Sequence, residues 1–238
     1  MKPLTYRVLV TATAALLLAC SVADRPKDTA DVRSRIAGSY GIDSFGQVDE
    51  MRYTFNVKLG DKQISRSWTW WPEDDRVEFR PDGDQTKAVR YSRTSLSAGA
   101  SEELKKIDAA FINDQYWLLF PFHLVWDRQT SVVDVGRRPL PIGSDSAHSV
   151  VVTYPPSGGY TPGDVYELFI APDNRLVQWI YRKGGSLEPT RVATWQDHRK
   201  VGPLTLALDH HGPNADFRVW FTDVAVRLKG SDRWYEAS

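Results

Sequence analysis

The sequence contains a single cysteine, no excess of charge of either sign and few long apolar runs. Among its 238 residues, 30 Lys and Arg balance 30 Asp and Glu. A lone thiol excludes an intrachain disulfide framework and any zinc or iron–sulfur cage built from several cysteines. The neutral balance excludes the broad basic surface that nucleic-acid binding requires, so we expect no nucleic-acid partner.

The N-terminus has the features of a targeting segment. Lys2 and Arg7 precede a run of apolar and small residues, 8–19, which ends at the only cysteine, Cys20. Such a run forms about 18 Å of helix, too short for a hydrocarbon core of about 30 Å, and is typical of a signal peptide. No later stretch of the sequence approaches the roughly 18 apolar residues of a transmembrane helix.

The tetrapeptide Leu-Leu-Ala-Cys at 17–20 resembles a bacterial lipobox. The resemblance implies cleavage after residue 19 and attachment of diacylglycerol to the Cys20 thiol, which anchors the protein to a membrane through its acyl chains. The alternative is an ordinary secretory signal followed by an incidental cysteine. We therefore expect a lipoprotein signal peptide over 1–19, a tether over 20–35 and one domain over 36–238.

The residues after the cysteine indicate a destination. Ser21 and Val22 stand where an aspartate retains lipoproteins of enteric bacteria in the inner membrane. By this resemblance we expect a lipid-anchored protein of the bacterial cell envelope, attached to the outer membrane and facing the periplasm.

Strand periodicity dominates the rest of the chain. Over 49–59 apolar and polar side chains alternate, which is typical of an antiparallel strand with one buried face. Further strands are predicted over 64–71, 76–80, 88–92, 149–154, 165–171, 175–182, 190–197, 204–210 and 217–228. Turn residues rich in Gly, Pro, Asn and Asp separate them at short spacing. About ten hairpin-connected strands without βαβ units predict an antiparallel barrel or a strongly curved sheet.

A helical pattern interrupts the strands. A helix is predicted over 100–113, where apolar residues recur every three or four positions, with Ser101 at its start and Asn113 or Asp114 at its end. The next run, 115–122, is apolar on both faces and contains a proline. It predicts a segment that is buried on both sides or that covers another part of the molecule.

The order of these elements resembles the LolA/LolB-like superfamily of lipoprotein-binding and lipid-handling periplasmic proteins. A short helix near 31–40 leads into a meander of strands, a helix interrupts it, and a second meander follows. The segment Asn-Asp-Gln-Tyr-Trp-Leu-Leu-Phe-Pro-Phe at 113–122 resembles a segment of uncharacterised bacterial lipoproteins assigned that fold. The resemblance implies a mainly β protein: a single half-open antiparallel barrel with an apolar concave face and one to three short helices as a lid.

The resemblance has limits that bear on function. LolA itself has no lipid anchor, so a lipidated Cys20 departs from that protein and agrees with anchored relatives. No motif specific to lipoprotein sorting can be matched in this sequence. The implied function is therefore the binding of a hydrophobic small molecule, or of the apolar part of a lipidated protein, by a monomer that is not an enzyme and needs no cofactor.

Aromatic residues are the candidates for a ligand-binding surface. Large rings supply rigid apolar area for an acyl chain, and their polar tips orient a ligand. The set is Tyr53, Phe55, Trp68, Trp70, Trp117, Trp179, Tyr181, Trp195 and Trp220. The alternative is that these residues form the core of a large curved sheet. A barrel of eight or more strands leaves a cavity unless large side chains fill it, so abundant Trp is compatible with both.

Histidine and carboxylate residues provide weaker candidates for chemistry. His198, His210 and His211, with Asp197 or Asp209, suggest a metal site, but adjacent strand residues point to opposite faces, so we predict no metal site there. The sequence has no Gly-x-Ser-x-Gly nucleophile motif. An envelope hydrolase or metal-dependent enzyme using these His and Asp side chains remains the alternative function, and a structural assembly lipoprotein is a third.

Overall fold

The computed structural model describes residues 29–81, 84–96 and 99–238. Cys20 and the predicted signal peptide lie outside the described residues. The described helices are α1 (Thr29–Tyr40), α2 (Ile42–Phe45) and α3 (Glu102–Trp126). The predicted N-terminal helix is therefore present and begins two residues earlier than expected, within the part of the chain assigned to the tether.

The larger sheet has the order β10-β11-β12-β1-β2-β3-β4, and β13 pairs with β12. All its pairings are antiparallel. Its strands are β1 (Val48–Leu59), β2 (Lys62–Trp71), β3 (Arg76–Pro81), β4 (Val89–Ser92), β10 (Gln196–Val201), β11 (Leu204–His211), β12 (Phe217–Leu228) and β13 (Trp234–Glu236). The first four strands form the predicted meander.

The smaller sheet has the antiparallel order β5-β6-β7-β8-β9. Its strands are β5 (Ser131–Pro139), β6 (Ser146–Thr153), β7 (Val165–Ile170), β8 (Leu176–Arg182) and β9 (Arg191–Thr194). One residue, Trp195, separates β9 from β10. Its N–H donates to the carbonyl of Val177 in β8 at 2.8 Å, whereas the next residue, Gln196, pairs with Asp209 in β11. The segment predicted as one strand over 190–197 thus leaves one sheet and joins the other at this point.

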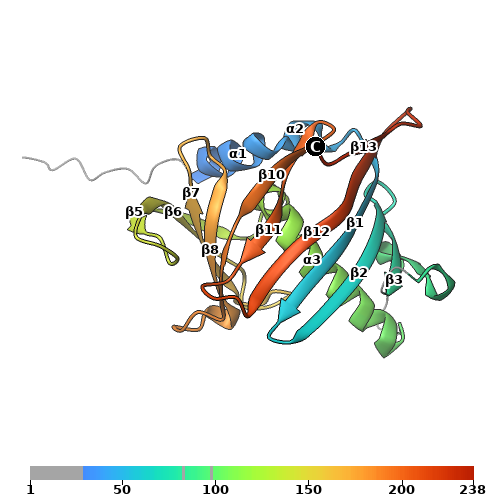
Figure 1. Ribbon diagram of the computed structural model, residues 1–238, viewed down its shortest axis with the longest axis horizontal. Coiled ribbons are helices and arrows are strands. Elements are labelled where there is room, and N and C mark those ends of the chain that lie inside the picture. Colours follow the sequence, from blue (N-terminus) through green and yellow to red (C-terminus); the bar gives the residue numbers. More distant parts are fainter. Residues whose placement is uncertain (1–28, 82–83, 97–98) are drawn as a thin grey trace, which may run out of the picture.

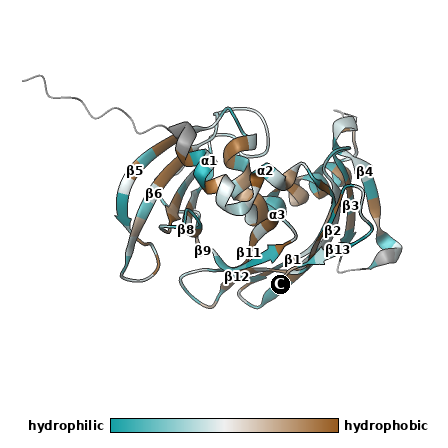
Figure 2. Ribbon diagram, turned by 90° about the horizontal axis from the view of Figure 1, so that it is seen from above, coloured by the Kyte–Doolittle hydropathy of each residue, from teal (hydrophilic) through white to brown (hydrophobic). Residues whose placement is uncertain are grey.

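Together the two sheets form a trough that is not closed into a barrel. Figure 2 shows the strands curving from β5 to β4 around the three helices. Figure 1 shows α1 and α2 at one end of the trough and the β1–β2 and β11–β12 turns at the other. This arrangement confirms the half-open antiparallel barrel predicted from the sequence. The sequence predicted one to three short helices, and the described residues form three α-helices. One of them, α3, spans 25 residues and is therefore not short.

The helix predicted to end at Asn113 or Asp114 continues to Trp126. Asp114 does not end it, because its buried carboxylate is paired with the Arg66 guanidinium through bonds of 2.6 and 2.7 Å. Pro121 lies inside the last turns, where it removes one hydrogen bond without ending the helix. The run that looked apolar on both faces is a helix segment surrounded by the trough, with Leu118 to Phe122 fully buried.

Packing of α3 against the concave face forms the core. The alternation predicted for β1 is confirmed, since Met51, Tyr53 and Phe55 are buried. Trp68 contacts Phe111 of α3 with ring centroids 5.4 Å apart. All helices and most strands contribute to one continuous hydrophobic cluster. The first residue of this cluster is Val32, so the chain from Ser21 to Ser238 contains the whole described core.

Candidate ligand-binding clefts

The trough is wider than α3, and an aromatic cleft of about 430 Å³ remains beside the helix. Phe55 and Val57 of β1 form one wall, and Trp179 and Tyr181 of β8 form the opposite wall. In each pair the two residues are separated by one position, so both side chains point to the same face of their strand. Trp117 of α3 forms the roof.

Ring contacts make the walls of the aromatic cleft rigid. Trp117 meets Trp179 edge to face, with centroids 4.7 Å apart and planes at 67°. Tyr181 stacks on Tyr166, with centroids 5.0 Å apart. Aromatic pairs in these geometries are stabilising beyond the area that they bury. The cleft is thus preorganised to accept apolar groups.

A wide cleft of about 850 Å³ lies next to the aromatic cleft along α3. Its apolar lining includes Phe45, Val48, Trp70 and Trp126. Both clefts fall within the range of roughly 300–1,000 Å³ typical of small-molecule sites. The wide cleft opens between the end of α2 and the loop that joins β6 to β7.

A half-buried polar cluster is part of the wide cleft. The Asp127 carboxylate accepts hydrogen bonds from the hydroxyls of Tyr116 at 2.9 Å and Tyr154 at 2.7 Å, and from His123 Nδ1 at 3.1 Å. Burial alone would raise the pKa of Asp127, but these hydrogen bonds and the His123 ring hold it below its usual value. Asp127 is therefore ionised at neutral pH and fixes Nδ1 of His123 as the protonated nitrogen.

The predicted aromatic residues are divided among several environments. Phe55, Trp117, Trp179 and Tyr181 line the aromatic cleft, and Trp70 lines the wide cleft. The structure thus brings four of the nine predicted aromatic residues together around the aromatic cleft.

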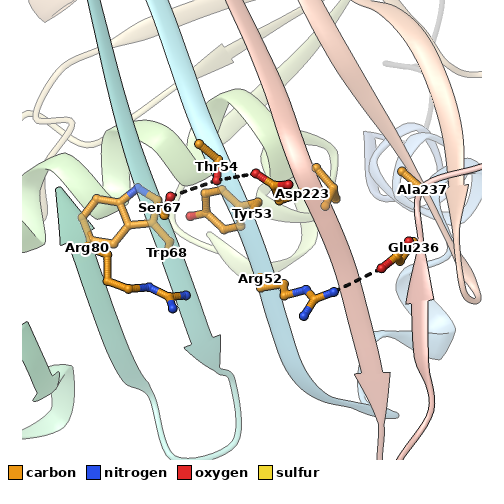
Figure 3. Close-up of a pocket in the computed structure, with 10 residues that line it drawn as sticks. Arg52, Tyr53, Thr54, Ser67, Trp68, Arg80, Asp223, Glu236 and Ala237 are labelled. Atoms are coloured by element: carbon orange, nitrogen blue, oxygen red, sulfur yellow. Dashed lines mark hydrogen bonds and ion pairs between the residues drawn. The ribbon is translucent and has the colours of Figure 1, made fainter. Parts of the chain in front are cut away.

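Tyr53 and Trp68 are buried, and neither lines a cleft beside α3. They lie below a separate polar groove of about 580 Å³ on the outer face of β1, β2 and β12. Figure 3 shows this groove, where Thr54 bonds to both Ser67 and Asp223. Its mixed polar lining does not suit an acyl chain.

The last two aromatic residues lie away from the clefts. Trp195 is buried in the core, edge to face with Trp179 at 5.2 Å between centroids. Trp220 is on the outer face of β12, beside Asn56, with the Arg218 guanidinium 4.8 Å from its ring centroid. Two neighbouring strand positions, Val219 and Phe221, are buried on the concave side instead.

The histidines of the second half do not converge. His198 bonds to the Tyr40 hydroxyl at 2.9 Å, His210 is buried, and His211 pairs with Asp209 at 3.0 Å. Within the part of the chain that the structure describes, no group of three His, Cys, Asp or Glu side chains could hold a metal ion.

Sequence reasoning missed several residues of the clefts. Tyr116 and Ile112 of α3 line both clefts, as do Tyr160 and Thr161 of the β6–β7 loop. The His123–Asp127 pair has the i,i+4 spacing of facing helix residues, which would have identified it had the helix been extended. Nothing local in the sequence indicates the position of Tyr160.

A half-wrapped antiparallel sheet around a buried helix, with two neighbouring clefts along that helix, defines a LolA-like fold. Solved structures with this fold include a DUF1329 family protein from Desulfovibrio piger, which aligns over 88% of this chain and 96% of its own, at 11% identity and a TM-score of 0.50. They also include a LolA superfamily protein from Nitrosomonas europaea, with 84% and 93% covered, 5% identity and a TM-score of 0.51.

Sequence comparisons add no closer relationship. No family model matches the chain, and no curated protein sequence matches it. At these low identities the structural likeness establishes the fold, which is the one that the sequence resemblance implied. Among the described helices, none is long and apolar enough to cross a membrane.

Proposed function

We propose that this protein is a lipid-anchored component of the bacterial envelope that binds a hydrophobic ligand in the clefts beside α3. The observation that carries the proposal is the aromatic cleft, which remains open although the surrounding core is densely packed. Apolar and aromatic side chains make up most of its lining, and hydroxyl groups and three charged side chains, Arg66, Asp164 and Arg191, supply the polar part. A mainly apolar pocket with a few polar groups is typical of a site for a small apolar ligand.

Location supports the same proposal. The lipobox-like sequence at 17–20 would anchor the chain through Cys20, and the absence of aspartate at position 21 favours the outer membrane. An anchored binding protein with a half-open trough is suited to exchange an apolar ligand, or the acylated end of a partner protein, near a membrane surface. The LolA superfamily name of a structural neighbour is consistent with this class of ligand.

The test is the recovery of bound lipid. The chain from Ser21 to Ser238, exported into a bacterial periplasm and purified, is examined by native mass spectrometry and organic extraction. Trp117→Ala is expected to abolish lipid co-purification, because it removes the roof of the aromatic cleft. Trp117 is a better probe than Trp179, whose truncation would also cost roughly 3–5 kcal/mol of core packing.

Trp220→Ala is the matched control, because it makes the same substitution on the outer face of the sheet. Retained lipid in this variant, with lost lipid in Trp117→Ala and a small difference in melting temperature between the two, supports the proposal. A clean apo mass for the unmodified chain, or equal lipid loss in both variants, contradicts it.

A further inference from the structure

The aromatic cleft and the wide cleft share a wall. Ile112 and Tyr116 of α3, with Tyr160 and Thr161 of the β6–β7 loop, line both of them. Only one face of the helix and one loop therefore separate the two spaces. If the loop moved, the two clefts would be continuous along this face of α3.

The loop over 155–163, here called the flap, has a closed base and an open tip. At its base the N–H of Gly163 donates to the carbonyl of Pro155 at 2.7 Å. At its tip Gly158 and Gly159 have φ values of 87° and 64°, and a Cβ at either position would meet no atom within 4 Å. Glycine permits a change of backbone conformation at these two positions, and no neighbouring side chain packs where their Cβ atoms would lie.

One side chain of the flap reaches a buried charge. Tyr160 is 49% exposed as a residue, yet its hydroxyl donates to the carboxylate of Asp108, which is fully buried in α3. Burial and the hydrogen bond to Asp108 raise the pKa of Tyr160 to about 12, so the hydroxyl remains a donor at physiological pH. This hydrogen bond, here called the latch, connects the flap to α3.

Loss of the hydrogen bond from Tyr160 does not leave the Asp108 carboxylate without partners. Asp108 also accepts hydrogen bonds from Arg93 Nε at 2.8 Å and from the Tyr91 hydroxyl at 2.9 Å. Removing the only partner of a buried charge is strongly destabilising, but here the ion pair with Arg93 persists when Tyr160 leaves. Opening the flap therefore requires the loss of a hydrogen bond and not of a charge partner.

We propose that the two clefts together form one binding site for an amphiphile with two hydrocarbon chains, and that the flap opens to admit it. This inference rests on the proposed function and specifies its ligand class. A single chain needs only one cleft, whereas two chains joined at a polar linkage match two apolar clefts that meet at a polar junction. Tyr116 and Thr161 line both clefts at that junction, and their hydroxyl groups supply hydrogen-bond partners for the linkage.

The first experiment blocks one cleft. Asn113 is exposed on α3 and lines only the aromatic cleft, so Asn113→Trp fills that space from the surface. The delipidated chain from Ser21 to Ser238 is titrated with oleic acid and with dioleoylglycerol, and native mass spectrometry gives the stoichiometries. We expect Asn113→Trp to reduce the number of oleic acid molecules bound per chain from two to one and to abolish binding of dioleoylglycerol.

The matched control places the same residue elsewhere on α3. Lys106 is exposed and lines neither cleft, so Lys106→Trp should bind both ligands as the unmodified chain does. Dioleoylglycerol that still binds Asn113→Trp at one molecule per chain would overturn the joined site.

The second experiment tests the latch. Tyr160→Phe keeps the ring and removes the hydrogen bond to Asp108, whereas Tyr91→Phe removes a bond to the same carboxylate from outside the flap. Stopped-flow fluorescence with a pyrene-labelled diacylglycerol should show association about fivefold faster for Tyr160→Phe, the factor that one typical net hydrogen bond contributes. Association of a pyrene-labelled fatty acid should be unchanged in both variants.

The outcomes separate the two levels of the proposal. Equal association rates for Tyr160→Phe and Tyr91→Phe would overturn the flap. Binding of oleic acid with exclusion of dioleoylglycerol by the unmodified chain would overturn the two-chain ligand and leave the proposed function standing. Failure of the unmodified chain to bind either compound would overturn both.

Discussion

Acidification should destabilise this protein through His210, a buried residue of β11. Its ring is fully buried, with the Trp195 centroid 4.6 Å and the Trp117 centroid 5.4 Å away. Nδ1 lies 3.0 Å from the carbonyl of Thr194, so Nδ1 carries the proton, and Nε2 has no partner among the described residues. Protonation would place a charge at Nε2 in an aromatic environment.

The size of the effect follows from the pKa. Burial lowers the pKa of His210 from 6.5 to about 4. Between these values the unfolded chain binds a proton that the folded chain does not, so the free energy of unfolding falls as the pH falls. The contribution is complete above pH 6.5 and is lost on the way to pH 4. One pKa unit corresponds to about 1.4 kcal/mol, so the loss is about 2 kcal/mol at pH 5 and about 3 kcal/mol at pH 4.

The assay is urea unfolding followed by tryptophan fluorescence at pH 7, 6, 5 and 4. His210→Phe keeps a planar ring and removes the titrating group, so its free energy of unfolding should fall less steeply over this range than that of the unmodified chain. Carboxylates that protonate near pH 4 change the free energy of unfolding equally in the unmodified chain and in His210→Phe, so their effect cancels when the two pH curves are compared. His211→Asn, a change at the neighbouring outward-facing residue, should keep the steep dependence. Parallel pH curves for the unmodified chain and His210→Phe would refute the reasoning.

Two further predictions concern the fold and the anchor. Asp114→Ala should lower the free energy of unfolding by about 3–5 kcal/mol in urea titrations, because it leaves the Arg66 guanidinium and the indole N–H of Trp68 without their buried partner. A decrease of less than about 1 kcal/mol would show that the Arg66–Asp114 ion pair is dispensable for stability. Cys20→Ala should release the protein from the membrane fraction, and membrane association that persists in this variant would contradict the lipoprotein interpretation.

Local patterns were sufficient wherever one face of an element is buried and the other is solvated. Over β1 the alternation of apolar and polar residues predicted the strand and its buried face, because the side-chain period of a strand is two. The strand over 217–228 was predicted with its observed bounds for the same reason. The turn residues between strands predicted hairpins, and hairpins without βαβ crossovers predicted an antiparallel sheet.

Prediction failed where burial is complete or the pattern is weak. The second half of α3 is apolar on every side because the trough surrounds it, so its sequence has no helical stripe to identify it. Polar residues that usually end a helix, such as Asp114, are tolerated in its interior because a partner on β2 neutralises them. The polar strand β5 and the short strand β13 were not predicted, since neither has a run of alternating apolar residues.

The sequence by itself determined the mainly β class, the positions of most strands and the aromatic composition of the interior. The prediction of a signal peptide and of a lipid anchor at Cys20 rests on the sequence alone. Only the tertiary structure decided which aromatic residues line an opening, because curvature of the sheet and the position of α3 place Trp117 and Tyr181 at a cleft and Trp195 in the core. Tertiary packing likewise brings Tyr160 of one loop to Asp108 of a helix 52 residues earlier. Contacts at such separations depend on how the whole chain closes, and no local pattern records them.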